Sequence, residues 1–368
     1  MRIAALPLLG AMGLLAAPAV AVADTASFDK IWSHAVLMGD RKAGDYPFIK
    51  LRGRYQGQYY GVDADDDGSA DGAETRRLRL GLDTRFNKAM RLSFDLNLNT
   101  DGKEPFVDDF DFLAFDWKVA QDTKLSIGKL RRKPLTREDS ISSNEILTVE
   151  RSLAANSVAL GNIGGVYVAH GMDSWDFGLG VLTGSLDDDL ELPDGDGGMA
   201  YQLNVGRAIN ENSEWRLDYL FNEGDPENDA IKDYRHTISL NSASQWGRIG
   251  LLTDLILAES LDNGGDLLGV VLLPAYKLTP QIALVARYTF LSSGDDDGVR
   301  LQKRYERAAD ELTGDRGDEY HALYLGANYY VYGDKLKLML GAEQSQLSRP
   351  GDSDFEALTG FAAFRVYF

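Results

Sequence analysis

The chain has 368 residues, with 57 acidic and 38 basic side chains, a net charge of −19 and no cysteine. The absence of cysteine excludes disulfide bonds and thiolate chemistry, and the negative charge argues against binding to nucleic acid, whose phosphates it would repel. After residue 23 no stretch approaches the roughly 18 consecutive apolar residues of a spanning helix, so a membrane role would require a closed β-barrel.

Residues 1–23 have the pattern of a secretory signal peptide. Arg2 precedes a long apolar run that ends in Ala-Val-Ala, and this small-residue ending favours cleavage over retention as a membrane anchor. We therefore expect export from the cytoplasm, with a short periplasmic segment at residues 24–46 and the main domain at residues 47–368. The short segment contains SFDKIWSHAVLM and either forms a helix or leads into the first strand.

The sequence FIKLRGRYQGQYY, at residues 48–60, alternates with a period of two. Between residues 49 and 59, apolar, aromatic or glycine residues occupy the odd positions, and cations or glutamines occupy the even positions. This pattern is typical of a β-strand with one apolar face. The polar face carries three cations: Lys50, Arg52 and Arg54.

The next segment, DADDDGSADGAE, matches the calcium loop of an EF-hand. Its flanks have the pattern of strands instead of helices, which excludes a calcium sensor. Two interpretations stay open: a solvated acidic hairpin loop, or a helix-free site that binds Ca²⁺ weakly and bridges to lipopolysaccharide phosphates. The ligands of that site would be Asp63, Asp65, Asp67, Asp71 and Glu74. No cofactor is expected to be required.

Alternation continues through the rest of the chain. Residues 75–86 and 90–99 are the second and third predicted strands, and Arg77, Arg79 and Arg85 lie on the polar face of the second. By the same criterion we expect further strands at residues 109–119, 123–131, 161–170, 174–184, 199–209, 213–222, 233–245, 247–259, 266–278, 280–292, 319–332, 334–346 and 355–368.

The connections between these strands alternate between short turns and long acidic loops. About 16 strands, short turns at one rim and long loops at the other are typical of an all-β, transmembrane antiparallel β-barrel of the bacterial outer membrane, with the turns in the periplasm. The final LTGFAAFRVYF alternates and ends in Phe368, which resembles the terminal strand of such proteins. A soluble sandwich or lipocalin-like barrel would rarely sustain so many long strands.

A barrel of about 16 strands is too wide for side chains to fill and leaves a water-filled channel. In the first three strands the inward-facing cations outnumber the carboxylates Asp83 and Asp95. Ion pairing with these two carboxylates would neutralise only part of the positive charge of the wall. The sequence therefore predicts a cationic channel that favours anions over neutral or positive solutes.

The segment IGKLRRKPLTREDSISSNEILTVERSLAANS and the earlier RRLRLGLDTRF resemble the phosphate-selective porin O/P family. The resemblance implies a homotrimeric anion-selective porin, in which an arginine ladder leads to a constriction made by the third outer loop, folded into the channel. It assigns ladder roles to Arg76, Arg77 and Arg79, and constriction roles to Lys129, Arg131, Arg132 and Lys133. The segment also holds Glu138, Asp139 and Glu145, and no complete set of phosphate ligands can be aligned.

We therefore expect passive, anion-preferring uptake of small solutes, with phosphate or polyphosphate as candidates, through a protein in contact with outer-membrane lipid and lipopolysaccharide. The alternative is a general porin, or one for sugars or organic acids. An outer-membrane enzyme is a remote alternative. The available bases are His34, His170, His236 and His321, and their spacing indicates no catalytic triad.

Overall fold

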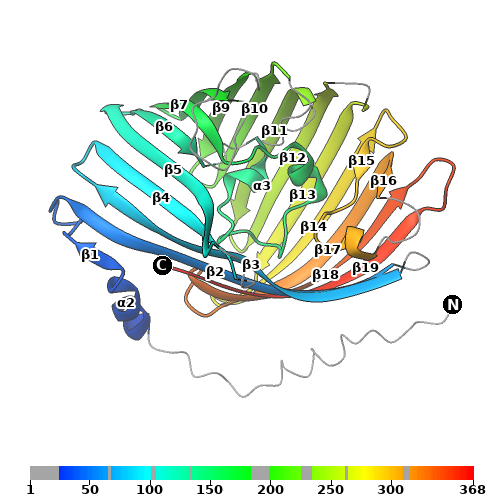
Figure 1. The fold of residues 1–368 in the computed structure, drawn as a ribbon, viewed down its shortest axis with the longest axis horizontal. Helices are drawn as coiled ribbons and strands as arrows, with labels where there is room; N and C mark the ends of the chain where they lie inside the picture. Colours follow the sequence, from blue (N-terminus) through cyan, green and yellow to red (C-terminus); the bar gives the residue numbers. More distant parts are fainter. Residues whose placement is uncertain are drawn as a thin grey trace.

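The computed structural model describes residues 25–64, 68–100, 105–131, 135–183, 199–224, 234–261, 264–309 and 315–368. Within these residues sixteen antiparallel strands close into one barrel, in which consecutive strands pair and the last pairs with the first (Figure 1). This confirms the predicted all-β barrel. The strands are β2 (Phe48–Ala64), β3 (Gly68–Arg85), β4 (Met90–Leu98), β5 (Val107–Ala120), β6 (Thr123–Leu130), β7 (Ile163–Met172), β8 (Trp175–Thr183), β9 (Met199–Asn210), β10 (Ser213–Asn222), β11 (Tyr234–Trp246), β12 (Ile249–Ser260), β13 (Leu267–Lys277), β14 (Ile282–Ser293), β17 (Glu319–Tyr330), β18 (Leu336–Ser348) and β19 (Phe355–Tyr367).

The N-terminal segment completes the seam between the last and first strands. Pairing of β19 with β2 begins only at Tyr367, so the first residues of β2 have no partner on β19. The short strand β1 (Val36–Met38) pairs with that part of β2, and helix α2 (Thr25–Ser33) precedes it. The Trp32 indole donates a hydrogen bond of 2.6 Å to the Tyr367 carbonyl. Residues 24–46 thus contain both a helix and a strand, whereas the predicted signal peptide lies outside the described residues.

The outer surface of the barrel is apolar, as the alternation predicts. Leu217, Leu240, Leu323 and Leu325 point outward with 40 to 57% of their area exposed, which suits contact with hydrocarbon. Among the described residues, no helix is long and apolar enough to cross a membrane. The connections at one rim are two to five residues long, such as residues 173–174 between β7 and β8.

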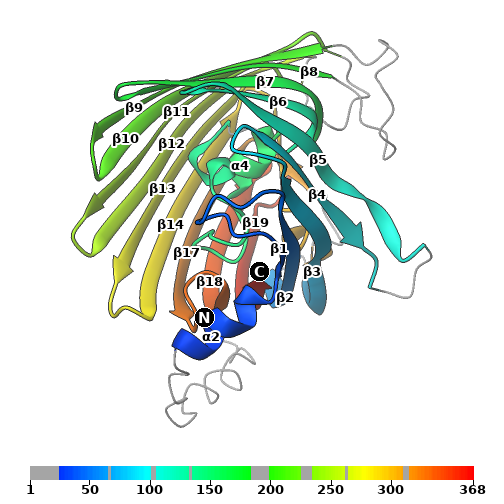
Figure 2. The ribbon, with the colours of Figure 1, turned by 90° about the vertical axis from the view of Figure 1, so that its left-hand side faces the viewer.

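Residues 131–162 follow β6 and are here called the inserted loop. Its described residues, 131 and 135–162, fold into the barrel (Figures 1 and 2). Two short helices shape the loop, α3 (Arg137–Ser140) and α4 (Leu153–Val158). The hydroxyls of Thr136 and Ser152 cap them by accepting hydrogen bonds from the first turn of each helix. Capping gives the polar backbone of the loop internal partners, which allows burial against the wall.

An apolar core holds the inserted loop against β12, β13 and β14. Leu135, Leu153 and Leu160 of the loop are buried in one cluster with inward side chains of these strands, among them Ile256 and Val271. The close approach also requires a small residue on β13. At Gly269, an added Cβ atom would lie 3.2 to 3.5 Å from Leu291, Ile256 and Ala154.

A second connection, residues 294–318, here called the covering loop, also packs against the inner wall. It contains β15 (Val299–Arg300), α5 (Glu306–Ala309) and β16 (Arg316–Gly317). The Tyr305 ring meets the inward Phe361 ring of β19 edge to face, with centroids 4.9 Å apart. The covering loop thus joins the wall beside the inserted loop.

The prediction of a loop from residue 63 to residue 74 is wrong. Strand β2 continues to Ala64 and β3 begins at Gly68, because β2 is hydrogen-bonded on both sides over this length, to β3 and to β19. Asp71 contacts the outward Tyr59, whereas Glu74 bonds to the inward Gln58, so the carboxylates point to opposite faces. Asp65 and Asp67 lie outside the described residues, and the calcium site stays a prediction.

We predict that Leu160→Ala destabilises the protein by about 2–5 kcal/mol, because a buried leucine leaves a cavity that the neighbouring side chains fill only in part. A guanidinium titration in detergent would measure this free energy of unfolding. Leu257→Ala on the outer face is the matched control and should cost less, since detergent fills the space. Equal losses for the two variants would contradict a packed core beneath the inserted loop.

Candidate anion pathway

Asp95 of β4 lies among the first group of predicted cations. The Arg52 guanidinium donates two hydrogen bonds to this carboxylate, of 2.6 and 3.0 Å, and Arg131 donates a third of 3.3 Å. Arg131 also stacks on the Phe112 ring, 3.9 Å from its centroid. One carboxylate therefore holds two guanidinium groups, which leaves one net positive charge.

Three further predicted cations each have a carboxylate partner on the inner wall. The nitrogen-to-oxygen distances are 2.6 Å for Arg79 and Asp111, 3.5 Å for Lys129 and Asp109, and 3.9 Å for Arg85 and Asp83.

Lys50 lies on the same face of β2 and interacts electrostatically with Arg52 and Asp83. Arg132 and Lys133 lie outside the described residues. The structure therefore brings together the other nine predicted pathway cations along β2, β3, β6 and the start of the inserted loop.

Arg54 of β2 has a neutral partner instead of a carboxylate. Its guanidinium donates a 2.9 Å hydrogen bond to the Ser143 hydroxyl of the inserted loop, and none of the described carboxylates forms an ion pair with it. The cations Arg79 and Arg131 and the carboxylates Asp95 and Asp111 interact with it electrostatically at longer range. Because a hydroxyl does not neutralise a guanidinium, Arg54 adds a full positive charge where the wall meets the inserted loop.

Arg76 and Arg77 are consecutive in β3, yet both side chains reach the interior. The register between β2 and β3 shifts between Gln56 and Gly57, and such a β-bulge opposes two residues to one and redirects a side chain. Arg77 donates a 2.8 Å hydrogen bond to the Gln56 side chain. Arg76 donates one of 2.6 Å to Glu150 of the inserted loop. The bulge therefore doubles the number of cations at this level of the wall.

Glu150 is the carboxylate that these cations surround. Burial would raise its pKa, but Arg76, Arg77 and Arg365 outweigh burial and hold the pKa well below its usual range. Glu150 therefore stays ionised at neutral pH. Three guanidinium groups face this one carboxylate, so the group again retains net positive charge.

Two cations of the last strands also bind the inserted loop, and the sequence analysis missed both. Arg365 donates to the carbonyls of Ser143 and Val149, and Lys337 donates to the Ile146 carbonyl at 2.9 Å. Both lie on the inward parity of β18 and β19, so the alternation used for the first three strands would have found them.

Arg287, also missed, is the single charged residue of β14. Its guanidinium donates to Glu343 at 2.7 Å, to Glu138 at 3.2 Å and to the Glu150 carbonyl at 2.7 Å. A lone charge in an apolar strand is a signal for such a buried partner. Glu138, which departs from the family pattern, therefore binds the barrel wall and does not line the channel.

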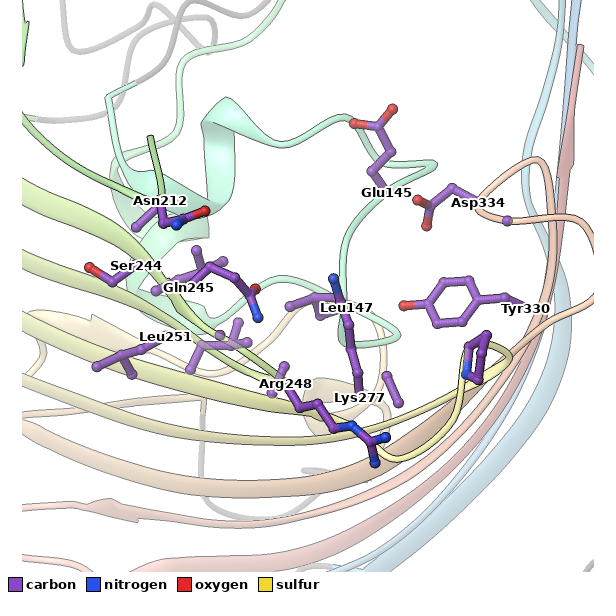
Figure 3. A pocket seen from close by; sticks show the side chains of 18 of the residues that line it. Glu145, Leu147, Asn212, Ser244, Gln245, Arg248, Leu251, Lys277, Tyr330 and Asp334 are labelled. Carbon is purple, nitrogen blue, oxygen red and sulfur yellow. The ribbon is translucent and has the colours of Figure 1, made fainter. Parts of the chain in front are cut away.

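Two cavities lie near the rim of short turns. One, of about 680 Å³, has a basic lining that includes Arg85, Lys88, Arg91, Lys118 and Arg216. The other, of about 1000 Å³, lies on the side of β9 to β18 and is shown in Figure 3.

The predicted ladder and the inserted loop both fall inside a segment that known proteins share. Residues 49–207 match the family of phosphate-selective porins O and P. This match confirms the resemblance seen in the sequence and covers β2 to most of β9. A comparison with curated protein sequences found no match.

Solved structures with a similar fold include an outer-membrane protein, an outer-membrane channel and a porin. OmpT of Vibrio cholerae is 12% identical with a TM-score of 0.56, covering 90% of this chain and 100% of its own. The channel DcaP of Acinetobacter baumannii is 10% identical with a TM-score of 0.58, covering 89% and 98%. A mutant of the Rh. blastica porin is 12% identical with a TM-score of 0.50, covering 86% and 99%. The family match and the fold together support an outer-membrane porin channel instead of an enzyme.

The covering loop carries a buried acid, Glu306. Its carboxylate accepts hydrogen bonds of 2.7 Å from the Tyr320 hydroxyl and from the backbone N–H of Gln302. Burial, reinforced by the nearby Glu343 carboxylate, raises the pKa of Glu306 to about 7 from 4.5. Because the folded-state pKa is the higher one, its contribution to stability is complete below pH 4.5 and is lost as the pH rises through about 7.

We predict that Glu306→Gln removes a pH-dependent part of the stability. As the pH rises from about 5 to about 8, the wild-type protein should lose on the order of 1–3 kcal/mol relative to this variant. Denaturant titrations of both proteins across this range would measure the difference. Asp296→Asn, at an exposed acid of the same loop, should follow the wild type, and parallel curves for wild type and Glu306→Gln would contradict the assignment.

Proposed function

We propose that the protein is an outer-membrane porin whose water-filled channel prefers small anions. The observation that carries this proposal is the excess of guanidinium groups over carboxylates where the wall meets the inserted loop. Seven guanidinium groups face three carboxylates there. The cations are Arg52, Arg54, Arg76, Arg77, Arg79, Arg131 and Arg365, and the carboxylates are Asp95, Asp111 and Glu150.

The partners of three of these cations explain why the excess is not neutralised locally. The side-chain hydrogen bonds of Arg54, Arg77 and Arg365 go to a hydroxyl, an amide oxygen and backbone carbonyls. Neutral acceptors fix the orientation of a guanidinium without removing its charge. Residues two apart on a strand lie about 7 Å apart, within the ~8 Å screening length at physiological salt, so an anion would meet one overlapping field.

Small oxyanions are the solutes that such a wall would favour, because guanidinium forks donate pairs of hydrogen bonds to their oxygens. Phosphate and polyphosphate are candidates. In this proposal the signal peptide is cleaved, the short turns face the periplasm and the outer surface contacts lipid and lipopolysaccharide. The assembly would be a homotrimer, as the family resemblance implies, and a weak Ca²⁺ site at the tip of the β2–β3 hairpin would bridge lipopolysaccharide phosphates.

Reversal potentials in a planar bilayer under a KCl gradient test the anion preference. We expect wild-type channels to prefer chloride, and Arg54→Gln or Arg77→Gln to lower the chloride-to-potassium permeability ratio severalfold, because each removes a charge that forms no direct ion pair with a described carboxylate. Arg207→Gln is the control, since Arg207 stacks on Trp175 at 4.9 Å on the outward face. A wild-type channel that prefers potassium would overturn the proposal.

Block of the chloride current separates general anion preference from a phosphate site. We expect phosphate and sulfate to block to a similar degree, because most of the guanidinium groups already have protein partners and the described residues offer no closed set of phosphate ligands. The measurement is the concentration of each anion that halves the chloride current at fixed ionic strength. A much lower value for phosphate than for sulfate would replace anion preference with phosphate selectivity.

A further inference from the structure

The larger cavity differs in chemistry from the arginine-rich wall. It lies between the inserted loop and the short turns, and has a volume of about 1000 Å³. The loop contributes Glu145 and Leu147 to its lining, and the N-terminal helix α2 contributes Phe28. Figure 3 shows Leu147, Lys277 and the Tyr330 hydroxyl directed into this space.

The wall of the cavity formed by β12, β13 and β14 is apolar. The side chains of Leu252, Leu273, Ala275 and Ala283 line it, and they are buried or partly buried. On the opposite wall the equivalent inward positions hold cations and carboxylates, as at Arg52 and Asp95. A solute in this cavity would therefore have hydrocarbon on one side.

Two cations border the apolar wall, Lys277 at the end of β13 and Arg248 in the turn before β12. Lys277 is exposed, and neither residue forms an ion pair with a described carboxylate. The side-chain contact of Arg248 is a hydrogen bond of 3.5 Å to the Leu278 carbonyl. These cations are thus available to a carboxylate that enters the cavity.

The cavity lining also holds four acidic residues, Glu145, Glu211, Glu214 and Asp334. Glu145 and Asp334 lie together on the side away from Arg248 (Figure 3), and Asp334 bonds to Lys337 at 3.0 Å. Glu214 bonds to Arg137 at 2.6 Å. The cavity therefore has a cationic part beside an apolar wall, with carboxylates on the sides of the β9–β10 and β17–β18 turns.

We propose that this cavity is a binding site for monocarboxylates with an apolar chain, the carboxylate near Lys277 and Arg248 and the chain along Leu252 and Leu273. The proposal rests on the anion-preferring channel and names the class of organic anion that it would carry. Convergent polar groups at the edge of an apolar pocket are typical of small-molecule sites. Inorganic phosphate could use only the cations, whereas an aliphatic acid would use both parts.

The test is block of the wild-type chloride current by butyrate, pentanoate and hexanoate added on the side of the short turns. A buried methylene contributes about 0.8 kcal/mol, so the blocking concentration should fall up to about fourfold for each added methylene. Lys277→Gln should raise the blocking concentration of all three acids by a similar factor, and the dependence of block on chain length should remain. Leu252→Ser should reduce the dependence itself. Lys118→Gln, which removes a cation from the other cavity, is the matched control.

Equal block by the three acids in the wild type would overturn the proposal, and this comparison does not depend on whether a variant folds. So would equal block by hexanoate and 6-aminohexanoate, since the ammonium group of the latter cannot lie on an apolar wall. Reversal potentials separate this failure from that of the proposed function. If the channel prefers chloride but chain length has no effect, only the carboxylate site is refuted; if it prefers potassium, the anion channel itself is refuted.

Discussion

A buried arginine, Arg287, fixes the inserted loop to the barrel, and the shape of the channel depends on this contact. Its guanidinium joins Glu138 of the loop to Glu343 of the wall and also binds the Glu150 carbonyl, and all three side chains of the ion-pair network are at least 96% buried. Removing one partner from such a network leaves an uncompensated charge and typically costs about 3–5 kcal/mol. A barrel of sixteen strands would otherwise leave a wide pore, so the narrowing beside the arginine-rich wall exists only while this loop is held in place.

The apolar core beneath the loop decides which wall the loop covers. Leu135, Leu153 and Leu160 pack on β12 to β14, and those strands carry few inward charges. The loop therefore lies over the apolar wall and reaches the cationic wall through hydrogen bonds from Arg54 and Arg76. Hydrophobic packing thus places the loop, and charge pairing sets its distance from the arginines.

The sequence was sufficient for the strands because lipid on one side and water on the other impose a period of two. It did not predict what packs against each strand from inside the barrel. Strands β12 to β14 are apolar on both parities because the inserted loop covers their inner face, and this loss of alternation is a readable signal. The inward position of Arg76 depends on a β-bulge, which no periodicity predicts. The acidic DADDDG hairpin resembled a loop by composition, but strand pairing with β19 extends through Asp63.

The proposed anion preference also requires that anions leave the channel. A cluster of free guanidinium groups would bind an oxyanion through several paired hydrogen bonds and hold it, whereas conduction needs binding that is weak enough to reverse. Here Arg52 and Arg79 donate hydrogen bonds to Asp95 and Asp111, and Arg77 donates one to Gln56. These hydrogen bonds occupy N–H groups that an anion could otherwise use. The positive charge is neutralised less, because the guanidinium groups outnumber the carboxylates. The wall can therefore attract anions through its field while offering each one too few donors to trap it.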